Sequence, residues 1–386
     1  MIIEVTGIGY ANKGAELMLC AVAERLGRLG DPEITLVAKP SVGSELGFRV
    51  LGRYGCLQKA SLIWKGLDLG TLPGNLLPRK LLRSYGFVAD KEIEAVLDAS
   101  GLKYSDKWGI KPTRRAVSEY ARLKKRGGKL VLLPQAFGPF TSETMRDNMR
   151  RLHEFADLIY ARDPVSYRHL TDLSGESSKI KIAPDFTALV RGTEVADADR
   201  FRNKMCVIPN QRMLDKTSEE VASLYLDALQ EFIKSCQALG WEVFVLNHEG
   251  EKDHELCLKL SQAFDPPLPY TGDRNAKEIK GLIHASAGVL TSRFHGLVSA
   301  LTQGVPVLAT SWSHKYEMLL KDFDAADCLV DVQQDRVALI RQFESWIRNL
   351  PTDGTRSHAR PHRVGELIQE IESLWNEVFR VIGLSA

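Results

Sequence analysis

The sequence has no pair of cysteines at the short spacing that metal sites and redox motifs need. Its six cysteines stand singly along the chain, and no other cluster of metal ligands is visible. Neither a zinc site nor a disulfide framework is therefore indicated. We expect free and mostly buried thiols, as in a reducing compartment.

Long apolar runs and an excess of charge are also absent. No stretch approaches the ~18 residues of a membrane-spanning helix. The opening residues Met1-Ile2-Ile3 provide neither the basic region nor the cleavage site of a secretory signal. A formal net charge of +2 gives no reason to expect nucleic-acid binding. These absences predict a cytoplasmic protein, and a length of 386 residues suggests two or three domains.

An alternation of strand and helix patterns fills the chain. Apolar runs typical of buried strands recur in both halves, each followed by helical spacing, and the polar segment Arg191–Phe201 suits a linker. This α/β pattern predicts two Rossmann-like, doubly wound domains facing each other across a cleft, over residues 1–190 and 200–350. We also expect an irregular segment at Gly43–Asn75, a short basic helix at Leu76–Tyr85 and a last strand at Cys328–Val332.

The stretch Ala285–Thr310 predicts a strand, a short turn, a helix and a second strand, which together form a βαβ unit. In such parallel sheets, ligands bind at the carboxyl ends of the strands. Arg293 and His295 stand in the turn two residues apart, so if the strand continues, their side chains leave the same face. A cation and an imidazole would then lie beside a helix N-terminus, which itself favours anions. The alternative is a structural Arg–His pair that closes the sheet edge.

A glycine-rich opening follows the first predicted strand, with Gly7, Gly9, Asn12 and Gly14. It departs from a dinucleotide fingerprint because Asn12 replaces the last glycine and no acidic residue ends the second strand. We interpret this loop as a turn that brings backbone N–H groups close to an anion or a sugar. A tight turn without a ligand is the alternative.

Several motifs, in order over roughly residues 5–320, resemble the polysaccharide pyruvyl transferase family. They are Gly7–Glu16, Pro134–Pro139, Ala161-Arg162-Asp163, Pro184-Asp185, and Ser292–Gly296 with Gly304-Val305-Pro306. The resemblance implies a fold like that of the two-domain GT-B glycosyltransferases, with a donor side in the second domain, an acceptor side in the first, and a last helix, residues 360–386, packing back on the first domain. It also implies transfer of pyruvate from phosphoenolpyruvate to a sugar as a cyclic ketal.

The residues fit this chemistry. The donor carries a phosphate and a carboxylate, and the planar fork of arginine binds such oxyanions in pairs, which makes Arg293 and Arg162 the candidates. Proton transfer needs a group that titrates near neutrality, for which we select His295 while leaving acid and base roles open. Further candidates are Lys315 and His248 for donor binding, and Asn12, Gly14, Glu16 and Asp185 on the acceptor side. Nothing in the reaction demands a metal or an organic cofactor.

Two other functions share this architecture. A GT-B glycosyltransferase or a sugar-nucleotide epimerase would use Arg293 on a pyrophosphate, and a non-catalytic relative would only bind a sugar or a phosphate. The acceptor sugar is not identifiable from the sequence, nor is whether it is attached to a lipid. A short segment mixes leucines with the basic residues Arg79, Lys80 and Arg83. This mixture suggests either a solvated surface or peripheral contact with the inner face of a membrane.

Overall fold

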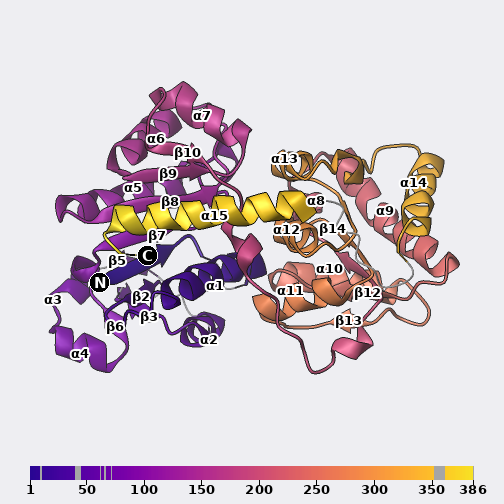
Figure 1. The fold of residues 1–386 in the computed structure, drawn as a ribbon, viewed down its shortest axis with the longest axis horizontal. Helices are drawn as coiled ribbons and strands as arrows, with labels where there is room; N and C mark the ends of the chain where they lie inside the picture. Colours follow the sequence, from indigo (N-terminus) through magenta and orange to yellow (C-terminus); the bar gives the residue numbers. More distant parts are fainter. Residues whose placement is uncertain are drawn as a thin grey trace. The chain divides into compact units, whose positions relative to one another are not determined.

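The computed structural model describes residues 1–8, 11–39, 45–60, 62–64, 67–70, 72–351 and 361–385. Gly9 of the glycine-rich opening lies outside these ranges. The chain forms two compact units. The first comprises Met1–Tyr10, Ala15–Leu189 and Ile368–Ala386, and the second comprises Ala11–Gly14 and Val190–Leu367. Each unit has one large parallel sheet with helices around it, so the predicted pair of Rossmann-like α/β domains is confirmed (Figure 1).

The sheet of the first unit has eight parallel strands in the order β10-β9-β8-β7-β1-β2-β3-β6. These strands are β1 (Ile2–Thr6), β2 (Thr35–Ala38), β3 (Leu57–Lys59), β6 (Phe87–Val88), β7 (Ala95–Asp98), β8 (Lys129–Gln135), β9 (Leu158–Ala161) and β10 (Ile180–Ile182). The helices before the second unit are α1 (Lys13–Gly27), α2 (Glu45–Arg53), α3 (Leu72–Leu76), α4 (Arg79–Ser84), α5 (Ile110–Lys125), α6 (Glu143–Phe155) and α7 (Pro164–Ser174), and a small hairpin pairs β4 (Leu62–Trp64) with β5 (Leu67–Gly70). The order reverses between β1 and β7.

The last helix, α15 (Pro361–Ile382), contributes its C-terminal part to the first unit. Trp375 of this part is fully buried, and its ring lies edge-on to Phe186 with the ring centroids 5.9 Å apart. The hydroxyl of Tyr160 on β9 donates a 2.7 Å hydrogen bond to Glu377. The segment from Ile368 onward is therefore part of the first unit's core although it lies at the other end of the sequence.

The sheet of the second unit has five parallel strands in the order β13-β12-β11-β14-β15. They are β11 (Met205–Ile208), β12 (Val243–Leu246), β13 (Tyr270–Thr271), β14 (Gly288–Thr291) and β15 (Val307–Ala309). The helices are α8 (Arg212–Asp215), α9 (Glu219–Ala238), α10 (Gly250–Gln262), α11 (Ala276–Ala285), α12 (Phe294–Thr302), α13 (Lys315–Asp322) and α14 (Arg336–Arg348). Counted within this unit the order is 3-2-1-4-5, the Rossmann arrangement, whose switch point lies between β11 and β14.

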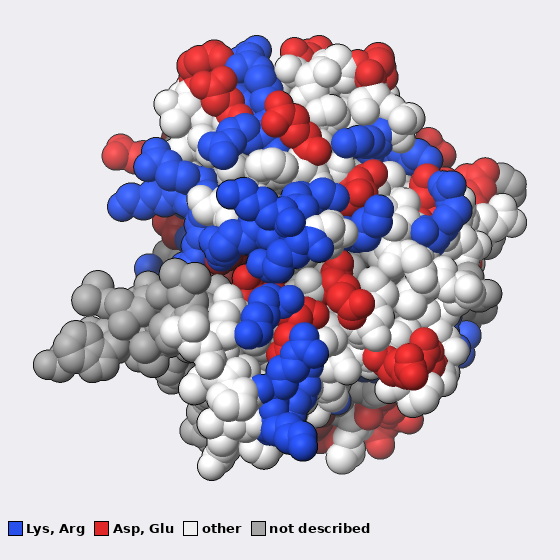
Figure 2. All heavy atoms as spheres, turned by 90° about the vertical axis from the view of Figure 1, so that its left-hand side faces the viewer, with Lys and Arg blue, Asp and Glu red and all other residues white. Residues whose placement is uncertain are grey.

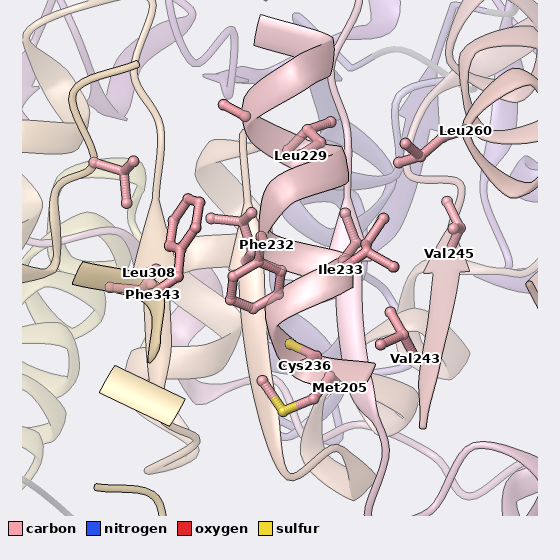
Figure 3. Packing of buried hydrophobic residues seen from close by; sticks show 14 of the residues in the cluster. Met205, Leu229, Phe232, Ile233, Cys236, Val243, Val245, Leu260, Leu308 and Phe343 are labelled. Atoms are coloured by element: carbon pink, nitrogen blue, oxygen red, sulfur yellow. The ribbon is translucent and has the colours of Figure 1, made fainter. Parts of the chain in front are cut away.

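The core of the second unit forms where α9 covers the sheet (Figure 3). Ser218 caps the N-terminus of α9, because its side chain accepts the N–H of Val221. Phe232, in the middle of the helix, packs edge-on against Phe343 of α14 with a centroid distance of 5.2 Å. α9 and α14 therefore pack against each other in the core of the second unit.

Three local predictions are wrong. The segment Gly43–Asn75 is not irregular where it is described, because it contains short elements that fall below the length at which periodicity is legible. Leu76–Tyr85 is not one helix, because Pro78 disfavours helical backbone at the residue before it, so α3 ends at Leu76 and α4 begins at Arg79. Cys328–Val332 is not a strand. Only Leu329 forms a bridge, with Ala309 of β15, and the apolar pattern instead reflects burial in the core.

The surface around α3 and α4 combines apolar and basic side chains. Leu76 and Tyr85 are 87% and 71% exposed. Arg79 and Arg83 project from the same segment and both pair with Glu92. Figure 2, which views the side of the molecule that carries these helices, shows Lys and Arg gathered in a band across the face with Asp and Glu between them.

Candidate functional site

Polar side chains gather at the carboxyl ends of three neighbouring strands of the second unit. Asn210 follows β11, Glu249 follows β12 and Arg293 follows β14. The reversal of strand order between β11 and β14 opens a crevice at this edge in open α/β sheets, and ligands bind there. The second unit therefore carries its candidate site where the fold predicts one.

Arg293 and His295 do not share the face of a strand, which corrects the prediction from their spacing. Strand β14 ends at Thr291, and the hydroxyl of Thr291 accepts the N–H of Arg293 at 3.0 Å. Arg293 is the residue that precedes α12, and His295 is the second residue of that helix. The chain enters α12 directly after Arg293. The part of the prediction that holds is that Arg293 and His295 both lie at the carboxyl end of β14.

The guanidinium of Arg293 is buried against two carboxylates of the same unit. Its Nε donates to Asp253 at 2.7 Å, one terminal nitrogen also contacts Asp253, and the other contacts Glu249. Asp253 is only 1% exposed, and its second oxygen accepts the N–H of Gln211 at 3.0 Å. Burial lowers the pKa of Arg293 to about 10, which leaves it charged at neutral pH. Burial also raises the pKa of the Asp253 carboxyl to about 7, although the hydrogen bond from the N–H of Gln211 and the charge of Arg212 act in the opposite direction.

The sequence reasoning missed Asp253. It precedes Arg293 by 40 residues and lies inside a helix, where an acidic residue resembles any solvated side chain. Only the pairing of the strands brings the start of α10 next to the end of β14.

The segment Ala11–Gly14 lies along this site. The N–H of Lys13 donates to the carbonyl of His248 at 3.2 Å, and Asn12 forms an antiparallel bridge with Glu249. A Cβ placed on Gly14 would lie 2.1 Å from Nδ1 of His295. Two predicted acceptor residues, Asn12 and Gly14, are thus grouped with the donor candidates in the second unit.

His248 is a buried histidine of the second unit whose pKa is lowered. Its side chain is buried, and its Nδ1 has no hydrogen-bond partner among the residues that the structure describes. Burial holds the pKa of His248 well below its usual range, and the charges of Arg293, His295 and Lys13 lower it further. These surroundings favour the neutral form of the imidazole.

Ser292 anchors the turn that carries Arg293 and His295. Its carbonyl accepts the side chain of Asn210 at 2.7 Å and the hydroxyl of Tyr316 at 2.8 Å. Its hydroxyl bonds to those of Tyr225 at 2.6 Å and Thr310 at 2.7 Å. Burial raises the pKa of both tyrosines, so their hydroxyls keep their protons and the network stays intact.

Lys315 lies close to the same turn. Its ammonium is 5.1 Å from the ring centroid of Phe294 and 4.8 Å from that of Trp312. Such cation–π contacts orient a lysine without neutralising it. The predicted donor-binding cation is therefore held beside the residue that precedes His295.

The other predicted residues lie in the first unit. Arg162 follows β9, and its guanidinium forms a buried ion pair with Asp185 at 2.9 Å. Asp185 also accepts the N–H of Thr187 at 3.0 Å. Glu16 is buried and pairs with Arg53 at 2.5 Å. The structure thus joins two of the predicted residues, Arg162 and Asp185, in a way that their spacing of 23 residues did not indicate.

A cavity of about 260 Å³ lies in the second unit near the C-terminal end of α12, whereas Arg293 precedes its N-terminus. Its lining is mostly apolar and includes Leu301, Val305, Phe323, Trp346 and Leu350. It lacks the cations that a phosphorylated donor needs, so we place the candidate site at the other end of the helix.

The described residues 1–8, 11–39, 45–60, 62–64, 67–70, 72–351 and 361–385 limit two kinds of site. No group of three or more His, Cys, Asp or Glu residues there could hold a metal ion. No helix within those residues is long and apolar enough to span a membrane.

Comparison with known proteins adds a family and a fold. A family model described as polysaccharide pyruvyl transferase matches residues 12–314. No curated protein matches the chain. Among solved structures, S. aureus MnaA with UDP has a TM-score of 0.61 at 11% identity, over 100% of this chain and 97% of its own. Anabaena HepE with UDP and glucose has a TM-score of 0.58 at 12% identity, over 99% of both chains. These likenesses confirm a GT-B-like fold.

Proposed function

The chain belongs to the polysaccharide pyruvyl transferase family, and we propose that it transfers pyruvate from phosphoenolpyruvate to a sugar of a polysaccharide or its precursor. The enol double bond of the donor takes a proton, and a sugar hydroxyl adds to the central carbon. Phosphate then leaves with its bridging oxygen, and a second hydroxyl closes onto the same carbon. The products are a cyclic pyruvate ketal and inorganic phosphate, without oxidation or reduction.

The observation that carries this proposal is the position of Arg293 and His295 together at the switch point of the second sheet. Asp253 and Glu249 hold the guanidinium of Arg293, and we assign this group to the carboxylate or phosphate of the donor. His295, two residues further along, is the group we assign to proton transfer. Lys315 and His248 supply a second cation and a buried imidazole that can take a proton once an anion is bound.

Arg162, Asp185 and Glu16 complete the set of residues that we propose for substrate binding. Arg162 and Asp185 form a buried ion pair, whereas the buried Glu16 pairs with Arg53, whose side chain is 43% exposed. Breaking the buried Arg162–Asp185 pair by removing one partner costs about 3–5 kcal/mol, so this pair resists rearrangement. We assign Arg162 to the donor and the two carboxylates, with Asn12 and Gly14, to the hydroxyls of the acceptor.

Donor-dependent stabilisation tests the proposal. Phosphoenolpyruvate should raise the melting temperature in buffer without divalent metal, since the donor site is built from cations of the chain. A ligand at a hundred times its dissociation constant adds about 2.7 kcal/mol to the free energy of unfolding. No shift at millimolar donor, together with a shift for a nucleotide sugar, would instead favour a glycosyltransferase or an epimerase. This alternative is motivated by the fold shared with UDP-bound MnaA and HepE.

We further propose peripheral contact with the inner face of a cytoplasmic membrane, which would suit a lipid-linked acceptor. The motivation is the surface of α3 and α4, where the exposed Leu76 and Tyr85 flank Arg79, Lys80 and Arg83. Apolar side chains can enter the headgroup region while basic ones meet anionic lipids.

A further inference from the structure

The two carboxylates that contact Arg293 are held very differently. Asp253 is buried inside α10, and the N–H of Gln211 fixes its second oxygen. The side chain of Glu249 is 24% exposed, and it precedes α10 without capping that helix. Asp253 therefore anchors the guanidinium, whereas the more exposed carboxylate of Glu249 contacts it through Arg293 Nη1.

Two carboxyl groups share the single guanidinium of Arg293. One guanidinium neutralises one carboxylate, and Asp253 already occupies two of its nitrogens. Glu249 places a second carboxylate on the remaining nitrogen, Nη1. An incoming anion that binds this end of the Arg293 guanidinium would meet the like charge of Glu249, which is costly in a desolvated site.

The main chain beneath Glu249 is fixed, so only its side chain needs to move. Its N–H donates to the side chain of Asn247 at 3.2 Å, and the next residue, Gly250, donates its N–H to Ala11 at 3.2 Å. The antiparallel bridge to Asn12 adds a further restraint. A rotation of the Glu249 side chain would expose Nη1 of Arg293 without disturbing the segment Ala11–Gly14.

We propose that Glu249 is a place-holder, a side chain whose carboxylate holds the position on Arg293 that the carboxylate or phosphate of the donor takes. The donor displaces the carboxylate and accepts the hydrogen bond from Nη1 in its place, and no covalent bond changes. Asp253 stays in place and keeps the guanidinium oriented throughout. This inference rests on the proposed function, because it assumes that Arg293 receives the donor. It makes Glu249 a residue that sets donor affinity and keeps weakly bound anions out.

The test is the affinity of Glu249→Gln for phosphoenolpyruvate and, separately, for inorganic phosphate, measured by calorimetry at fixed ionic strength. Removal of the competing charge should tighten donor binding about tenfold, a cost within the range for one like-charge contact. Glu251→Gln makes the same change of charge at an exposed position two residues away and should leave the affinity unchanged. If Glu249 instead supports Arg293, the variant will bind the donor more weakly and melt lower, which would overturn the inference.

Arg293→Lys separates this inference from the proposed function. It keeps the charge but loses the two-pronged fork, so donor affinity should fall. If the parent binds no phosphoenolpyruvate, or if Arg293→Lys binds it as the parent does, the assignment of the donor to Arg293 is wrong. If Arg293→Lys weakens donor binding while Glu249→Gln fails to tighten it, Arg293 does bind the donor. The proposed role of Glu249 as a place-holder is then wrong. The exposed Arg336→Lys is the control for the arginine change.

Discussion

The backbone of Gly14 lies so close to His295 that a Cβ at position 14 would be 2.1 Å from Nδ1 of the imidazole. Atoms at that distance overlap, so Gly14→Ala must displace the ring or the start of α1. Overpacking of this kind costs about 1–3 kcal/mol. We expect pyruvyl transfer to fall at least about a hundredfold, the lower bound for loss of general acid–base catalysis, with the melting temperature lowered by a few degrees.

Gly27 provides the matched control, because it ends the same helix and an added Cβ would meet no atom within 4 Å. Gly27→Ala should keep both activity and melting temperature. Full activity in Gly14→Ala would mean that the position of the His295 ring is irrelevant to the chemistry.

Replacement of His295 tests its assigned role directly. His295→Ala should bind the donor nearly as well as the parent, while turnover drops about 10²–10⁴-fold, the usual contribution of general acid–base catalysis. His295→Gln should recover little, because an amide can donate a hydrogen bond but cannot exchange a proton at neutral pH. The measurement is phosphate release beside donor affinity, with melting as the check on folding. A folded His295→Ala that retains more than about a tenth of the parental rate would exclude His295 as the catalyst.

The buried His248 predicts a loss of stability in mild acid. Its pKa in the folded chain lies well below the value of about 6.5 expected in the unfolded chain. Between these two values the unfolded chain binds more protons, so the free energy of unfolding falls as the pH drops below about 7. The contribution of one such group is at most about 1.4 kcal/mol per pH unit.

His248→Asn should reduce this dependence, and denaturant unfolding at several pH values between 7 and 5 is the measurement. The pKa of His153 is also lowered by burial, so some dependence will remain in both proteins. Identical pH profiles for the parent and His248→Asn would show that His248 takes up its proton without penalty in the folded chain.

Binding to anionic vesicles tests the surface of α3 and α4. The triple change of Arg79, Lys80 and Arg83 to Ser should abolish salt-sensitive co-sedimentation, since each basic residue near an anionic membrane contributes about 1 kcal/mol. Replacement of Arg336, Arg341 and Arg348 on α14 by Ser alters the charge equally and should have no effect. A parent protein that never sediments with acidic vesicles would rule out membrane contact through this surface.

Much of the fold could be predicted from the sequence because it depends on local patterns. Apolar runs followed by helical spacing identified most strands and helices. Their alternation along the chain in turn predicted the Rossmann-like α/β class. The ordered motifs indicated the family, and the family model that matches residues 12–314 confirms it. The sequence predicted a turn over Ser292–Gly296 between a strand and a helix, but only Ser292 and Arg293 lie between them, because α12 already begins at Phe294.

Contacts between distant segments were decided only by the tertiary structure. The sequence by itself gave no reason to join Asp253 to Arg293, Arg162 to Asp185 or Gly14 to His295, because sheet pairing and helix packing bring these residues together across 40, 23 and 281 positions. The sequence specified which groups are available for chemistry through the local propensities of the chain. Their partners, burial and pKa values follow from the order in which the strands assemble, and no local pattern encodes that order.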